Sequence, residues 1–196
     1  MTLIRAVLLL SLAWAPLAAQ APQRTIPDGI VREGRLSFDA RATAGTFTGT
    51  TTSVTGEMHG GGLSQVRGWV EAPVRTLGTG NQRRDRDLNK SMESGKYPTI
   101  RFELTGVAAP ETASDSVNVA LHGRFIIHGV TREATVPASV AFHPEGIRVR
   151  GTTPLNLKDY KIGGLSKALG MLKMDEKILV HLDLMFGAES SLQAGR

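Results

Sequence analysis

Histidines are the side chains of this sequence best suited to hold a metal ion or to move a proton near neutral pH. The chain contains no H-E-x-x-H motif and no two histidines at i, i+4 spacing, the patterns that bring two imidazoles to one zinc ion. No group of carboxylates accompanies them, and we expect no metal site. The histidines are scattered singly along the chain: His59, His122, His128, His143 and His181. The His128-Gly129 pair indicates a turn.

The sequence also lacks the residue patterns typical of nucleophilic and acid–base catalysis. No G-x-S-x-G motif follows a strand pattern, and the chain has no cysteine, which excludes thiol chemistry. Asp85 and Asp87 are two residues apart, so on a helix they would point in different directions and could not share a proton. The Arg83–Asp87 cluster is typical of a solvated helix face. We expect no catalytic residue and no cofactor.

That charged cluster belongs to one predicted helix, Gln82 to Met92, which is rich in helix-forming residues. Leu88 and Met92 are four residues apart and would share one apolar face. Asn81 is the expected N-cap, and Gly95 is expected to stop the helix. The sequence therefore predicts one short helical insertion between two strands.

The rest of the chain alternates apolar and polar residues with the period of a β-strand. About eight such segments are separated by short turns, with no βαβ rhythm and no internal repeat. Residues 63–77 are expected to form one continuous strand, and residues 166–172 to form one or two helical turns. This pattern predicts an all-β protein with an antiparallel sheet, either closed into a barrel or folded as a sandwich.

The apolar faces of these strands would converge on one interior if the sheet closes. Such an interior is a filled core or a channel for an apolar ligand, and periodicity alone favours the filled core. A channel needs gaps, which small residues could supply: Gly68, Ala72, Gly123 and Ala138. The predicted interior residues are Leu36, Phe38, Val70, Val74, Ile100, Phe102, Leu104, Phe125, Ile127, Val136, Val140 and Phe142.

The N-terminus has the pattern of a secretory signal peptide. Arg5 precedes an apolar run from Ala6 to Ala15, and Ala19-Gln20-Ala21 fits a cleavage site. We expect a signal peptide over residues 1–21, a loose lead-in over 22–34, one barrel domain over 35–186 and a flexible tail over 187–196. The mature protein would be periplasmic or secreted.

The charge distribution argues against nucleic-acid binding. Lysine and arginine number 23 against 18 acidic residues, and acidic residues interleave with the one basic run. Peripheral contact with anionic lipid head groups is the better-supported use of the excess positive charge.

Two motifs resemble the YceI-like family of bacterial polyisoprenoid-binding proteins. The first runs from Thr79-Gly80-Asn81 through Arg84-Asp85 and Leu88 to Lys96-Tyr97-Pro98-Thr99-Ile100. The second is Phe125 to Pro137, FIIHGVTREATVP. A weaker match combines Asn156 to Ile162 with the terminal strand Lys177 to Phe186.

The resemblance implies an extended, lipocalin-like barrel of about eight antiparallel strands, and so chooses the barrel over the sandwich. It places the helical insertion beside one end of that barrel, where Arg84, Asp85, Leu88 and Met92 would organise the covering segment. Met92-Glu93-Ser94-Gly95 departs from the family's commoner pattern, in which aromatic residues follow the charged helix.

The function implied is that of an exported binding or carrier protein, not an enzyme. Its barrel would enclose an isoprenoid lipid, an isoprenoid quinone or another amphipathic lipid. Two alternatives stay open at this point: an enzyme acting on such a lipid near the barrel mouth, and a stress-related envelope protein with no enclosed ligand. The resemblance is also compatible with a homodimer.

Overall fold

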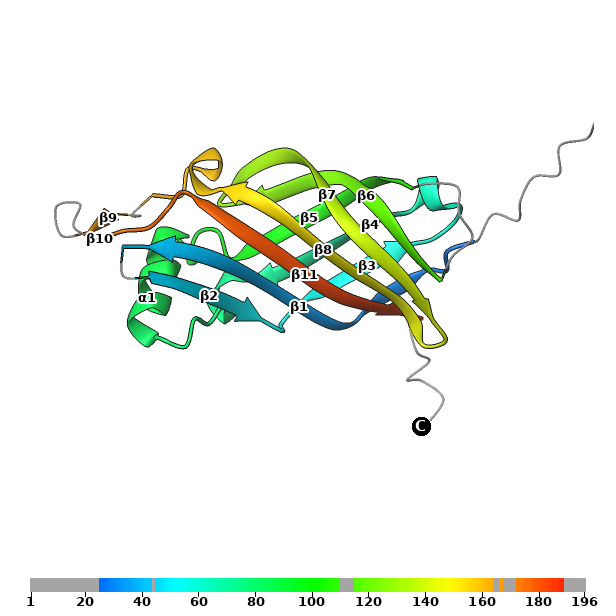
Figure 1. The fold of residues 1–196 in the computed structure, drawn as a ribbon, viewed down its shortest axis with the longest axis horizontal. Coiled ribbons are helices and arrows are strands. Elements are labelled where there is room, and N and C mark those ends of the chain that lie inside the picture. The colour runs from blue at the N-terminus through cyan, green and yellow to red at the C-terminus, as the bar shows by residue number, and fades with distance from the viewer. Residues whose placement is uncertain (1–24, 44, 110–114, 164–165, 168–171, 189–196) are drawn as a thin grey trace, which may run out of the picture.

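The computed structural model describes residues 25–43, 45–109, 115–163, 166–167 and 172–188 (Figure 1). The predicted signal peptide and nearly all of the predicted tail lie outside these residues. No helix in the described part of the chain is both long enough and apolar enough to cross a membrane.

Eight antiparallel strands form a closed barrel, which confirms the predicted fold class. Hydrogen bonding between the first and last strands closes it, with Leu36 opposite Leu182. Around the barrel the strands are β1 (Gly29–Ala42), β3 (Thr55–His59), β4 (Arg67–Pro73), β5 (Thr99–Ala108), β6 (Ser116–Ile127), β7 (Val130–His143), β8 (Gly146–Asn156) and β11 (Lys177–Gly187).

A further strand, β2 (Gly45–Thr51), pairs with the second half of β1. Its continuation β3 pairs with the beginning of β1, so β2 and β3 follow one another along the same edge. Thr50 of β2 forms an isolated bridge to Gly78. Two very short strands, β9 (Ser166–Lys167) and β10 (Leu172–Lys173), make a separate hairpin.

Helix α1 (Gln82–Ser91) lies at one end of the barrel (Figure 1). Asn81 is its N-cap, as predicted: the side-chain oxygen accepts hydrogen bonds from the backbone N–H groups of Arg83 and Arg84 at 3.0 and 3.1 Å. The short helix η1 (Leu63–Gln65) lies at the opposite end, whereas η3 (Leu157–Tyr160) lies at the α1 end.

Four local expectations are corrected. Residues 63–77 are not one strand, because β4 ends at Pro73, which has no N–H to continue a ladder, and the 3-10 helix η2 (Val74–Thr76) follows. Ser166–Lys167 and Leu172–Lys173 form the short strands β9 and β10 where helical turns were predicted, and residues 168–171 lie outside the described residues. β1 begins at Gly29, six residues before the expected start at Arg35. Glu93, with a left-handed φ of 45°, ends α1, and Gly95 does not.

Candidate functional site

The strand registers bring the predicted interior residues onto the inner face of the barrel. Val70 lies opposite Phe102 across β4 and β5, and Leu36 lies opposite Leu182 across β1 and β11. Most of the predicted residues belong to the apolar core or pack against it: Val70, Val74, Ile100, Phe102, Leu104, Phe125, Ile127, Val136, Val140 and Phe142.

Leu36 and Phe38 are placed differently. They are half-buried and are not among the described residues of that core. The Phe38 ring lies over Gly49 and meets Phe47 edge-on, with ring centroids 6.2 Å apart. Phe38 therefore makes an apolar contact between β1 and β2, whereas Leu36 pairs with Leu182 of β11.

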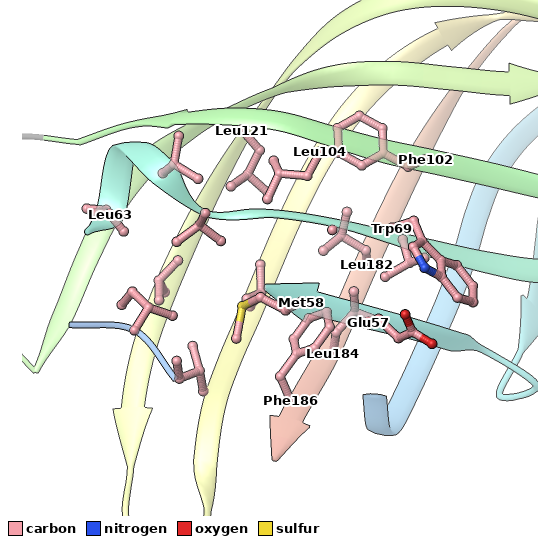
Figure 2. Close-up of a pocket in the computed structure, with 18 residues that line it drawn as sticks. Glu57, Met58, Leu63, Trp69, Phe102, Leu104, Leu121, Leu182, Leu184 and Phe186 are labelled. Atoms are coloured by element: carbon pink, nitrogen blue, oxygen red, sulfur yellow. The ribbon is translucent and has the colours of Figure 1, made fainter. Parts of the chain in front are cut away.

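The barrel contains an apolar cavity of about 80 Å³. This exceeds the roughly 10–15 Å³ that one water molecule needs, but a cavity with an apolar wall stays dry and suits a hydrocarbon. In Figure 2 the side chains of Met58, Leu104, Leu121, Leu184 and Phe186 converge on it. The cavity lies in the half of the barrel that η1 closes, away from α1 (Figure 1).

Val70, Phe102, Leu104 and Val140 are the predicted interior residues that line this cavity. The wall also contains residues that the sequence interpretation did not assign to the site. For the residues in β8 and β11, the alternating spacing along each strand was the available signal. These additional residues include Met58, Leu63, Val66, Ile147, Val149, Leu182, Leu184 and Phe186.

Of the four small residues expected to leave space in the barrel interior, one lines the cavity. Gly68 lines the cavity, but Ala72 and Gly123 do not. A Cβ atom at Gly123 would lie 2.6 Å from Cζ of Phe102, so the Phe102 ring already fills that space. Ala138 belongs to the buried apolar core but does not line the cavity.

The residues expected to organise the α1 segment all make contacts there. Oδ1 of Asp85 accepts hydrogen bonds from the backbone N–H of Thr79 at 2.9 Å and from its hydroxyl at 2.6 Å. The Arg84 guanidinium lies 4.1 Å from the centroid of the Phe47 ring, a cation–π contact. Leu88 packs against the core and Met92 belongs to it. These are contacts that hold the helix in place.

His128 joins three segments at the α1 end of the barrel. It has a left-handed φ of 52°, and its imidazole is nearly fully buried. Nδ1 lies 2.9 Å from the Tyr160 carbonyl oxygen, Nε2 lies 3.4 Å from a carboxylate oxygen of Glu93, and the ring contacts Tyr97. Burial raises the pKa of the Tyr160 hydroxyl. His128 is therefore a structural junction as well as a turn residue.

On the outer surface, arginines are paired with carboxylates. Arg148 makes a bidentate contact with Asp183 at 2.7 and 2.8 Å, and Arg150 reaches the same carboxylate at 3.1 Å. The Arg148 hydrogen bond is the main reason that the pKa of Asp183 lies below its usual value. In the described part of the chain, no three His, Cys, Asp or Glu side chains are grouped closely enough to hold a metal ion.

A closed antiparallel barrel of eight strands with an apolar cavity is a lipocalin-like fold. The sequence model of the YceI-like domain family matches residues 31–186, and the chain belongs to this family. A search of curated proteins finds no match.

Two solved structures share this fold. One is BcnA of Burkholderia cenocepacia, at 14% identity and a TM-score of 0.64, covering 77% of this chain and 94% of BcnA. The other is a polyisoprenoid-binding domain of Saccharophagus degradans implicated in plant cell wall breakdown. It also has 14% identity and a TM-score of 0.64, covering 83% of this chain and 99% of that domain.

Proposed function

We propose that this protein is an exported carrier that encloses the hydrocarbon chain of an isoprenoid lipid, such as an isoprenoid quinone or a polyprenyl lipid, inside its barrel. The observation that carries the proposal is the apolar cavity of about 80 Å³ within the barrel. Each CH₂ group moved from water into such a space contributes about 0.8 kcal/mol. A few isoprene units therefore supply useful affinity without any polar contact.

The cavity as it stands holds only a short apolar segment, so a longer chain requires its wall to adjust. Met58 is suited to this because a thioether side chain has several rotatable bonds and fits irregular apolar shapes. Membership of the YceI-like family and the polyisoprenoid-binding description of the Saccharophagus domain support an isoprenoid as the ligand.

A carrier role is favoured over an enzymatic one by the contacts of Arg84 and Asp85. Asp85 is occupied by two hydrogen bonds from Thr79, and Arg84 stacks on Phe47. Both residues thus have structural partners that account for them without a reaction. The predicted signal peptide supports export to the periplasm or the medium.

The test is organic extraction of the protein purified from its native host, followed by mass spectrometry. We expect an isoprenoid in near-stoichiometric amount. A variant that fills the cavity, Val140→Phe, should lose most of it, whereas Ala141→Phe on the outer face of the same strand should retain it. Equal isoprenoid content in both variants would place the ligand outside the cavity. Conversion of added lipid to a new product would favour the enzyme.

A further inference from the structure

The outer face of α1 carries a cationic stripe. Arg83, Arg86 and Lys90 are exposed and occur at i, i+3 and i+7, which places them on one side of the helix. At 100° per residue, Leu88 and Met92 lie on the opposite side, and both face the core. The helix is therefore amphipathic: an apolar side faces the barrel and a basic side faces solvent.

The ion pairing of these three cations differs from that of the arginines on the barrel wall. Arg101 and Arg124 contact Glu103, and Arg148 and Arg150 contact Asp183. No ion pair joins Arg83, Arg86 or Lys90 to a carboxylate in the described part of the chain. Asp87, at the edge of the stripe, has an interaction of its own. The positive charge of the stripe is thus available to an external partner.

The stripe is held rigidly in place. Asn81 caps the helix, Asp85 binds Thr79, and the neighbouring Arg84 is stacked on Phe47 of β2. The β9–β10 hairpin projects from the same end of the barrel (Figure 1). A fixed basic surface at one end of an elongated molecule can set the orientation of that molecule on a charged plane.

We propose that the stripe of Arg83, Arg86 and Lys90 docks the α1 end of the barrel onto an anionic phospholipid surface. This inference builds on the proposed carriage of a lipid, because a carrier must meet the membrane that supplies or receives its cargo. Docking by α1 leaves the cavity at the far end from the membrane. A lipid that enters from the docked end would therefore enter tail first.

The three positive charges of the stripe determine the expected affinity for an anionic membrane. Each basic residue near an anionic leaflet contributes about fivefold in affinity, equivalent to about 1 kcal/mol. Three residues together contribute roughly a hundredfold at low salt. The effect should weaken as salt shortens the Debye length, which is about 10 Å at 0.1 M ionic strength.

The experiment is co-sedimentation of the full mature protein with vesicles of phosphatidylcholine, with and without phosphatidylglycerol. Arg83→Gln/Arg86→Gln/Lys90→Gln should lower binding to the anionic vesicles by roughly a hundredfold. The matched control, Arg35→Gln/Arg124→Gln/Arg150→Gln, removes the same charge from exposed positions on the barrel wall and should retain most of the binding. Circular dichroism establishes that both variants are folded.

Three results would overturn docking: no preference of the native protein for anionic vesicles, equal losses in the two triple variants, or equally tight binding to duplex DNA. Extraction of bound isoprenoid from the same preparations separates this inference from the proposed function. Vesicle binding without bound isoprenoid would refute the carrier alone. Bound isoprenoid without vesicle preference would refute the docking alone.

Discussion

The ring of Phe102 covers Gly123 on the neighbouring strand: a Cβ atom at residue 123 would lie 2.6 Å from Cζ of the ring. The same Cβ would lie 2.2 Å from the Glu103 carbonyl oxygen, which belongs to the β5 backbone. Phe102 also meets Phe125 at a centroid distance of 4.8 Å. Glycine at position 123 of β6 thus leaves the space that the Phe102 ring of β5 occupies in the interior.

Gly123→Ala should destabilise the protein by about 1–3 kcal/mol, because a methyl group there forces the ring and the β5 backbone to move. Gly106→Ala is the matched control, since it lies in β5 with no atom within 4 Å of the added carbon. Urea unfolding of both variants provides the measurement. A Gly123→Ala midpoint equal to that of Gly106→Ala would contradict this account of the interior.

Asn81→Ala should cost about 1 kcal/mol of stability, because the first turn of α1 loses its side-chain acceptor. Asn81→Asp keeps an acceptor at the same position and should retain the stability. Thermal unfolding followed by circular dichroism distinguishes the two variants. Equal melting temperatures for Asn81→Ala and Asn81→Asp would show that the cap does not contribute to the stability of the protein.

His128→Asn should destabilise the α1 end of the barrel. Asparagine tolerates the left-handed backbone of this turn, but it loses the ring contact with Tyr97. Its amide Nδ2 can take the place of Nδ1 as a donor to the Tyr160 carbonyl, so the expected loss comes from the missing ring and from its Nε2 end, which lies near Glu93. Hydrogen exchange should increase first in η3 and in the turn after α1. Unchanged exchange in both segments would show that the junction is not needed.

Stability should decrease in acid partly through Asp183. Its pKa is lower in the folded protein than the value of about 3.9 expected when unfolded, so the Arg148 and Arg150 contacts stabilise the fold fully above that value. The contribution is lost as pH falls through the folded pKa, and for a partly exposed group it amounts to at most about 1 kcal/mol.

Asp183→Asn should therefore destabilise the protein at neutral pH and reduce the slope of stability against pH below about pH 4. Glu145→Gln, in the exposed turn between β7 and β8, serves as the control. Chemical denaturation at a series of pH values gives both slopes. An unaltered slope in Asp183→Asn would assign the acid sensitivity to other carboxylates.

The sequence by itself determined the elements whose causes are local. Asn81 caps α1, Leu88 and Met92 place its apolar side, and alternation identifies strands such as β5 and β7, because each signal lies within a few residues of the structure it produces. The end of α1 was predicted to within one residue, but the residue that ends it was wrongly assigned to Gly95, because Glu93 adopts a left-handed conformation usually taken by glycine.

Tertiary structure decided how the barrel closes and where its interior is empty. Leu36 and Leu182 meet across β1 and β11 from opposite ends of the domain, and periodicity does not reveal which strands become neighbours. Gly68 and Gly123 are both inward-facing glycines, yet Gly68 lines the cavity and Gly123 lies beneath Phe102. The difference depends on the size and direction of side chains on adjacent strands. Space inside a closely packed barrel is a property of all the strands around it and not of any one of them.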